Sequence, residues 1–286
     1  MEIATLPGYK RPVPSRTMAI ASGAIATLLL LLAVSAGAQT RPLLTEEATT
    51  GPSGRLVFET GLQAIVDEPN YLTGVERTRW EGPLLRLAYS AADNVDFGID
   101  WAGVVGTTGV PGEAAVSAGG DVTLRAKLRI LKGDERRPTL AGRFGVILPN
   151  TPFNDKQFNP LGLGPNTFRF FLEGLVTWPV GPVRLDGNAG LFLQDEVLRP
   201  HEQRDFLSYA LAMRWSAKPG LEVVGEFAGR EGIPEPGAPR RSEVRAGLRL
   251  GRGRFRADAA VRRGLISVQG TWGGTVGLSW TVRPGR

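Results

Sequence analysis

Apolar and polar residues alternate with a period of two along most of the chain after residue 54. In residues 121–130, the even positions hold Val, Leu, Ala, Leu and Ile, and the odd positions hold Asp, Thr, Arg, Lys and Arg. A helix would spread these charges over every face, whereas a strand places them all on one side. The pattern recurs at 95–101 and 168–178, and no segment of helical period competes with it. The sequence therefore predicts an all-β protein.

The alternation predicts about twelve strands, whose connections are alternately short and long along the chain. An up-and-down barrel in an outer membrane has short periplasmic turns and long external loops, whereas a Greek-key sandwich has no reason to keep this rhythm. We therefore predict a closed antiparallel up-and-down transmembrane β-barrel over 55–282, preceded by a short periplasmic segment at 39–54 and followed by a tail at 283–286. The strands are expected near 55–65, 84–90, 94–102, 121–131, 139–148, 167–178, 183–193, 206–216, 221–230, 242–250, 255–262 and 272–282.

Charged residues within the predicted strands fall on one phase, and the opposite phase is apolar. Lipid demands such sorting, because an Arg facing the bilayer midplane costs roughly 2–4 kcal/mol. A soluble secreted sandwich with its apolar face inward would show the same two phases, so that alternative stays open. In a barrel, the charged phase would line the pore. The residues predicted to line it are Arg125, Lys127, Arg129, Arg143, Arg169, Glu173, Arg184, Asp186, Glu222, Glu226, Arg245 and Arg249.

Bases outnumber acids on this phase, which would bias a narrow pore toward anions. Internal pairing is the plainer interpretation of most of these charges. If the strands at 94–102 and 121–131 pair, Asp96 and Asp100 lie opposite Arg125, Lys127 and Arg129. The long segment 149–166 would narrow the opening if it folds inward, although it could equally cap the outside. Its expected constriction residues are Phe153, Phe158 and Leu161.

Five tryptophans fall on the apolar phase near predicted strand ends: Trp101, Trp178, Trp215, Trp272 and Trp280. Tryptophan suits the membrane interface, because its ring is apolar and its N–H can reach water or headgroups. The alternative is that they are core residues of a sandwich. Trp80 is out of phase with its neighbours, and only a bulge at Pro83 would explain it.

The first 38 residues have the features of a secretory signal peptide. Lys10, Arg11 and Arg16 precede 21 uncharged residues, from 18 to 38, that end in Ala-Gly-Ala. An uncleaved anchor helix is the alternative, and Met18 is a second possible start. Export through this leader places the barrel in a cell outer membrane, in contact with lipid and lipopolysaccharide.

Composition removes several classes of function. The chain has 42% hydrophobic and 22% charged residues, a net charge of +6, one His and no Cys. It is therefore not disordered, and it has neither a disulfide framework nor a thiolate or His-rich metal site. The basic residues form no block longer than two, which argues against nucleic-acid binding. His201 lies in a predicted long loop beside Pro200, where a solvated histidine is expected, so we predict no catalytic residues.

The last strand, residues 275–282, is similar to the C-terminal assembly signal of bacterial outer-membrane barrels, with Gly277 followed by alternating apolar positions. It departs from that signal in ending on Val282 rather than an aromatic residue, with four residues after it. The resemblance implies the barrel-assembly machinery as a partner.

More of the chain, about residues 55–282, resembles the phenol-degradation meta-pathway-like family of outer-membrane transporters. The resembling pieces are Gly-Asp at 120–121 before the strand with Lys127, Leu-Pro-Asn-Thr at 148–151, Leu-Gly-Leu-Gly at 161–164, and the strand with Asn188. The resemblance implies about twelve strands, no cofactor, and transport of small, including aromatic, compounds.

Together these observations predict a passive outer-membrane channel for small solutes, aromatic or anionic, through a narrow Arg-lined lumen. The alternative is a barrel that does not transport: a surface-binding or structural protein or, less expected, a membrane hydrolase that uses His201.

Overall fold

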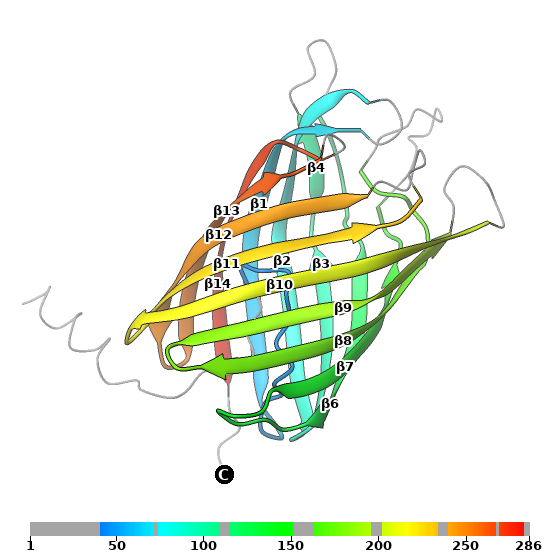
Figure 1. Cartoon of the computed structure of the whole chain (residues 1–286). Coiled ribbons are helices and arrows are strands. Elements are labelled where there is room, and N and C mark those ends of the chain that lie inside the picture. Colours follow the sequence, from blue (N-terminus) through cyan, green and yellow to red (C-terminus); the bar gives the residue numbers. More distant parts are fainter. Residues whose placement is uncertain are drawn as a thin grey trace, which may run out of the picture.

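The structure, a computed structural model, describes residues 41–70, 74–108, 115–151, 163–195, 202–233, 240–266 and 269–282. Twelve strands of these residues form one closed ring, in which each strand runs antiparallel to both neighbours (Figure 1). The ring consists of β1 (Leu56–Pro69), β2 (Glu76–Ala92), β3 (Val95–Ala102), β6 (Val122–Leu131), β7 (Thr139–Leu148), β8 (Arg169–Val180), β9 (Val183–Asp195), β10 (Gln203–Lys218), β11 (Leu221–Glu231), β12 (Arg241–Arg252), β13 (Phe255–Gly264) and β14 (Trp272–Val282).

The first and last strands close the barrel. β1 pairs with β14 from Leu56↔Val282 to Val66↔Trp272, and its other edge pairs with β2. Closure leaves no free edge in the ring of twelve strands, which a sheet surrounded by hydrocarbon requires. The predicted fold class and strand number are confirmed. Among the residues described, no helix is long and apolar enough to cross a membrane.

Two features of the sheet differ from the sequence prediction. β2 begins at Glu76 rather than near 84, because an extra residue at Gly82–Pro83 interrupts its register with β1 and the strand then continues. This bulge reverses the phase, so Trp80 lies exposed on the outside, as the bulge hypothesis required. Two short strands, β4 (Val105–Thr108) and β5 (Val116–Ala118), lie in a predicted loop and extend the sheet beside the upper part of β2.

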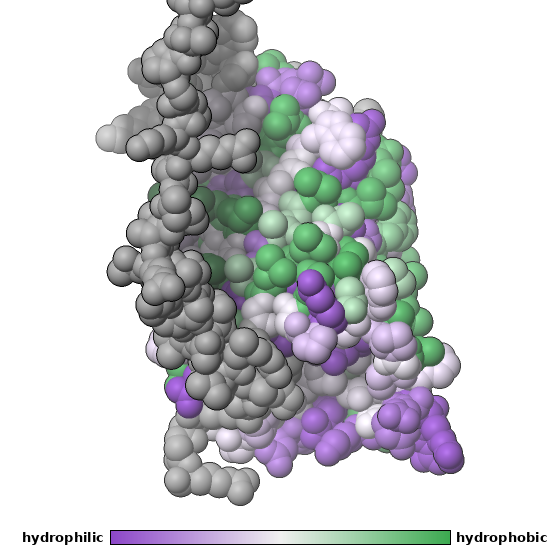
Figure 2. All heavy atoms as spheres, turned by 90° about the vertical axis from the view of Figure 1, so that its left-hand side faces the viewer, coloured by the Kyte–Doolittle hydropathy of each residue, from purple (hydrophilic) through white to green (hydrophobic). Residues whose placement is uncertain are grey.

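Large apolar side chains cover the outside of the barrel. Leu172 and Leu211, in the middle of their strands, are each 61% exposed, and Phe144 is 56% exposed. Figure 2 shows a hydrophobic band around the middle of the visible face, with hydrophilic residues at its ends. Water-soluble monomers rarely expose contiguous apolar patches above a few hundred Å². The band is what a barrel surrounded by lipid requires.

The inside of the barrel is polar, charged and largely filled. Buried charges such as Lys127, Arg214 and Asp186 project inward from the wall. Residues 41–55, which we call the N-terminal segment, run through the lumen and lead into β1 (Figure 1). From the sequence, a short periplasmic segment is expected here. The structure instead places its described part inside the barrel, because its two glutamates meet the excess of lumen bases.

Candidate functional site: the lumen and its N-terminal segment

The N-terminal segment runs inside the lumen from β12 and β14 to β2 and β3. At one end, the Arg41 carbonyl accepts a hydrogen bond from Arg249 of β12 (2.6 Å). At the other end, the Gly54 amide donates to the Ser90 carbonyl of β2 (2.7 Å). Between these ends the segment passes β11, β9 and β8 in turn. The segment therefore follows the inside of the wall and ends at the short turn between β2 and β3, where Thr50 and Ser53 donate to Asp93.

Wall side chains satisfy the backbone of the middle of this segment. The Leu44 amide donates to the Glu226 carboxylate (2.9 Å), and the Ala48 amide donates to the Thr177 hydroxyl (2.8 Å). Asn188 both accepts from the Glu46 amide (2.7 Å) and donates to the Glu46 carbonyl (2.9 Å). Buried backbone groups need such partners. Because these partners are side chains and not a neighbouring strand, the middle of the segment belongs to no sheet.

Two small apolar contacts anchor the segment to the wall. Leu43 packs with Ala212 of β10 and Val224 of β11. Ala48 packs with Ala141 of β7 and Leu175 of β8. These four wall residues are apolar positions on an inner phase that is mostly polar. Water is therefore excluded where Leu43 and Ala48 contact the wall.

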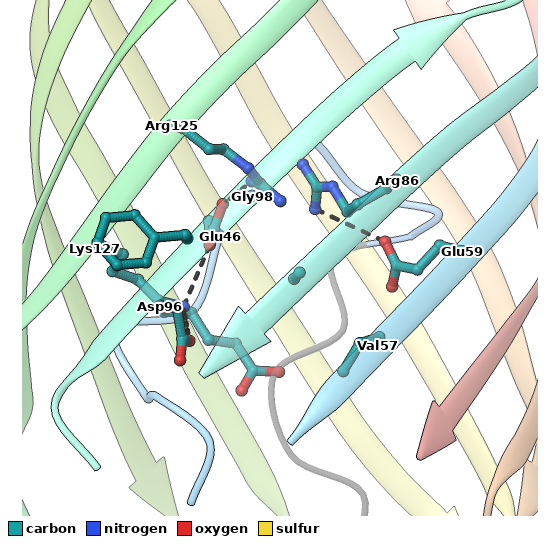
Figure 3. A pocket seen from close by; sticks show the side chains of 11 residues that line it. Glu46, Val57, Glu59, Arg86, Asp96, Gly98, Arg125 and Lys127 are labelled. Carbon is teal, nitrogen blue, oxygen red and sulfur yellow. Dashed lines mark hydrogen bonds and ion pairs between the residues drawn. The ribbon is translucent and has the colours of Figure 1, made fainter. Parts of the chain in front are cut away.

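Glu46 is the electrostatic centre of the segment (Figure 3). Its carboxylate pairs with Lys127 (3.1 Å), Arg143 (2.6 Å) and Arg125. Burial raises the pKa of this carboxyl, but the coulombic attraction of these cations outweighs burial and holds the pKa well below its usual value. Glu46 is therefore ionised at neutral pH and ties β6 and β7 to the segment.

Glu47 makes the equivalent contact further along the wall, beyond β8. Its carboxylate pairs with Arg184 of β9 (3.1 Å) and with Arg214 of β10. Arg214 also contacts Asp186, which is fully buried (3.1 Å). The backbone carbonyl of Glu47 accepts a hydrogen bond from Lys127 (3.2 Å). Glu46 and Glu47 thus bind two different parts of the wall, which are separated by β8.

Arg41 lies where β1 and β14 meet. Its guanidinium donates to the Thr275 hydroxyl (2.7 Å) and pairs with Asp258 (3.5 Å). It lies directly over the cross-strand pair Gly61 and Gly277, where a Cβ on either glycine would collide with it. Glycine at position 277 therefore leaves room for this side chain.

Cross-strand ion pairs neutralise many of the wall charges. β3 pairs with β6, and Lys127 contacts Asp96 (3.4 Å) while Arg125 contacts Asp100 (3.1 Å). The internal pairing anticipated from the sequence is confirmed for these strands. Arg245 is paired within its own strand, where it contacts Glu243 (2.6 Å). The described lumen is consequently a charge network and not a row of free cations.

The other predicted site residues can be placed where the structure describes them. All twelve predicted pore-lining residues lie on the inner phase of their strands, and Arg129 is half-buried there. Whether they line a conducting pore stays a prediction. The constriction residues Phe153, Phe158 and Leu161, and His201, lie outside the described residues, as does the predicted signal peptide. The five predicted interface tryptophans lie on the outer face and are 40–52% exposed: Trp101, Trp178, Trp215, Trp272 and Trp280.

The described residues enclose cavities inside the barrel. One of about 300 Å³ lies on the long-loop side of the segment, between Arg77 and Arg79 of β2 and Arg230 and Arg241 of β11 and β12. Another, about 30 Å³, lies beside Glu46 and has room for a water molecule (Figure 3). No group of three or more side chains suited to hold a metal ion occurs in the described part of the chain.

Sequence reasoning missed the residues of the N-terminal segment, Leu43 to Ala48. Two signals were present. Adjacent acids at 46 and 47 precede a barrel whose inner phase is rich in bases. Apolar residues such as Ala212 and Leu175 also interrupt the polar phase, which water alone does not explain. Both signals indicate an internal partner, but neither identifies which segment supplies it.

No protein-family model matches the sequence, and no curated protein matches it. Comparison with solved structures finds an outer membrane channel from Pseudomonas putida F1, with a TM-score of 0.62 and 15% sequence identity over 82% of this chain and 98% of that one. The translocator domain of the autotransporter NalP from Neisseria meningitidis matches with a TM-score of 0.51 and 15% identity, over 79% of this chain and 87% of that domain. At such low identity the resemblance concerns the fold, and the chain has the fold of bacterial outer-membrane β-barrels.

Proposed function

We propose that this protein lies in an outer membrane and is a narrow channel for the passive passage of small solutes, with its N-terminal segment as the internal constriction. The apolar outer band and the closed ring support the membrane location. A ring of twelve strands encloses more space than the filled eight-strand barrels and less than a sixteen-strand porin. A solved neighbour described as an outer membrane channel has this fold.

The observation that carries the proposal is the way the segment is held. From Leu44 to Ala48 its backbone bonds to wall side chains, and Glu46 and Glu47 bind cations of four different strands. Such contacts can exchange for water without breaking any strand pairing. The barrel wall would therefore stay intact when the segment moves, and the space it occupies would become a path.

Two features bear on the solute. The resemblance to the phenol-degradation meta-pathway-like family supports small aromatic compounds. The bases lining the cavity on the long-loop side, among them Arg77, Arg230 and Arg241, support anions. Both are compatible with a solute no larger than that cavity of about 300 Å³.

Reconstitution into planar bilayers tests the proposal. We expect discrete ion currents of low conductance from purified protein, and faster swelling of vesicles in small solutes than in disaccharides. A barrel whose folded state is confirmed by its heat-dependent migration on a denaturing gel, yet which passes no current, would refute the channel.

A barrel that does not transport is the second candidate, and one observation favours it. The segment occupies part of the lumen, and the cavity beside Glu46 admits only water. If the segment never leaves, the protein is a closed scaffold with an external binding face. A variant with a weakened segment separates the two functions, because a channel then conducts more and a scaffold whose segment stays in place does not.

A further inference from the structure

The outside of the barrel is hollowed where β12, β13, β14, β1 and β2 lie side by side. A groove of about 740 Å³ lies there, and the residues that line it are mostly apolar. Its floor consists of small residues on the outer face, among them Ala64, Ala246 and Gly274. On β7 and β8 the outer face instead carries large side chains such as Phe144 and Leu172, which are 56% and 61% exposed. Hydrocarbon can therefore enter the wall more deeply at this groove than beside β7 and β8.

A cation lies one outward-facing position beyond the groove. Val261 lines the groove, and Arg263 faces the same way two residues further along β13, about 7 Å away by the rise of a strand. The cross-strand neighbour of Arg263 on β14 is Trp272, and the guanidinium carbon lies 4.5 Å from the centre of the Trp272 ring. Cation–π contact holds the charge over this ring. Trp272 is itself two residues from Gly274 of the groove floor, so the Arg263 and Trp272 pair lies directly beside the groove.

Arg263 and Trp272 have the features of a membrane interface on the long-loop side. They flank the connection between β13 and β14, and Trp272 is 52% exposed. Tryptophan is favoured where hydrocarbon meets headgroups, and arginine can lay its stem along apolar surface while its charge reaches the polar layer. Arg263 forms no ion pair with a carboxylate of the described residues, and Asp67, at the neighbouring end of β1, accepts a hydrogen bond from the Thr271 hydroxyl (2.9 Å). The positive charge of Arg263 is therefore presented to the headgroup layer.

An apolar groove beside an interfacial cation fits an amphiphile with an anionic headgroup. A flexible acyl chain can follow the groove and make the dispersion contacts that an unfilled hollow would lack. A second copy of the chain fits less well. All copies have the same orientation in a membrane, so a twofold axis runs along the membrane normal and brings the two Arg263 side chains to the same height on facing surfaces. Such like charges oppose association, whereas an anionic lipid complements the charge of Arg263.

We propose that this groove and Arg263 bind lipopolysaccharide, with one acyl chain in the groove and a phosphate group on the guanidinium of Arg263. Lipopolysaccharide belongs to the external leaflet of an outer membrane, and the long loops of an outer-membrane barrel lie on that side. The planar donors of a guanidinium match the oxygens of a phosphate. The inference goes beyond the proposed channel and rests only on the membrane location stated with it.

The test uses lipid A, the phosphorylated and acylated part of lipopolysaccharide, and lipid A from which the phosphates have been removed. Each is titrated into the folded, full-length protein in a neutral detergent, and bound lipid is counted by native mass spectrometry. Lipid A is expected to bind about tenfold more tightly than its dephosphorylated form, because the charge-assisted hydrogen bonds to Arg263 are then lost. Arg263→Gln is expected to weaken lipid A binding by a similar factor. Ala246→Phe fills the groove and is expected to weaken the binding of both lipids.

Two variants are matched controls and should bind lipid A like the wild type. Arg254→Gln removes the same charge from the exposed short turn between β12 and β13, at the other end of the barrel, and Ala126→Phe adds the same ring to the lipid-facing side of β6. Heat-dependent gel migration confirms that each variant is folded.

Unchanged lipid A affinity in Arg263→Gln or in Ala246→Phe overturns the site. Equally tight binding of phosphatidylglycerol assigns the groove to phospholipid and overturns the proposal, as does a dimer of the protein that Ala246→Phe dissociates. The site and the channel are tested separately, because Arg263 lies outside the lumen and Arg263→Gln should leave conductance unchanged. A protein that binds lipid A without conducting keeps the site and loses the channel, and one that conducts without binding lipid A keeps the channel and loses the site.

Discussion

Replacing both glutamates of the N-terminal segment should release it from the wall. In the Glu46→Gln, Glu47→Gln double variant, the cations that these carboxylates contact lose their partners while the segment stays docked. With the segment displaced, water would hydrate those cations. The substitutions therefore raise the free energy of the docked state and leave that of the displaced state almost unchanged.

The size of the effect follows from burial. The side chains of Glu46 and Glu47 are only 10% and 3% exposed, so solvent screens these pairs little. Removing one partner of a buried ion pair costs about 3–5 kcal/mol. Because the two glutamates share one network, their effects are not additive, and we take about 3 kcal/mol as the minimum for the pair. This corresponds to a rise of roughly a hundredfold or more in the displaced population.

Single-channel recording in planar bilayers measures that population as conductance and open probability, and both should increase in the double variant. Limited proteolysis should also cut the segment faster. Glu68→Gln is the matched control, because it removes one lumen carboxylate that contacts Arg79 and not the segment. If conductance and cleavage in the double variant match the wild type, the segment is not held by these charges and the reasoning is wrong.

Three further outcomes are expected. The pKa of Glu46 is held below its usual value, so its contribution to docking is complete above about pH 4.5 and is lost as pH falls through the lowered pKa. Conductance should therefore be constant from pH 7 to 5 and rise only in stronger acid. Leu211→Arg places a charge on the lipid-facing side of β10 and should lower the free energy of unfolding by roughly 2–4 kcal/mol, measured by urea titration in vesicles. An unchanged urea midpoint of unfolding would contradict a lipid-facing position. Gly277→Leu should displace Arg41 and raise conductance. The control Gly142→Leu, at a site with open space around the Cβ position, should leave conductance unchanged. Equal conductance in the two variants would count against the contact with Arg41.

The alternation of apolar and polar residues was sufficient to predict the ring, because burial in a barrel depends on strand phase alone. All twelve strands and the pairing of Asp96 with Lys127 could be predicted from local pattern and neighbouring register. The upper part of β2 could not, since the extra residue at Gly82–Pro83 reverses the phase that the prediction follows.

The site was less accessible to sequence reasoning. The N-terminal segment has no period of its own, and its contacts reach far along the chain: the partners Arg41 and Thr275 are 234 positions apart. Only the charge balance of the lumen hinted at an internal acid. Which segment supplies that acid depends on where the chain enters the barrel, and no local pattern encodes this.

The N-terminal segment continues directly into β1, so it remains covalently tethered to the wall even when its other contacts are broken. Return to the lumen is then an intramolecular step, governed by an effective concentration on the order of millimolar for a short tether. Occlusion should accordingly be independent of protein concentration and recover by itself after each opening. A soluble peptide copying residues 41–50 would have to compete with that tether, and would therefore be a weak inhibitor of the intact barrel.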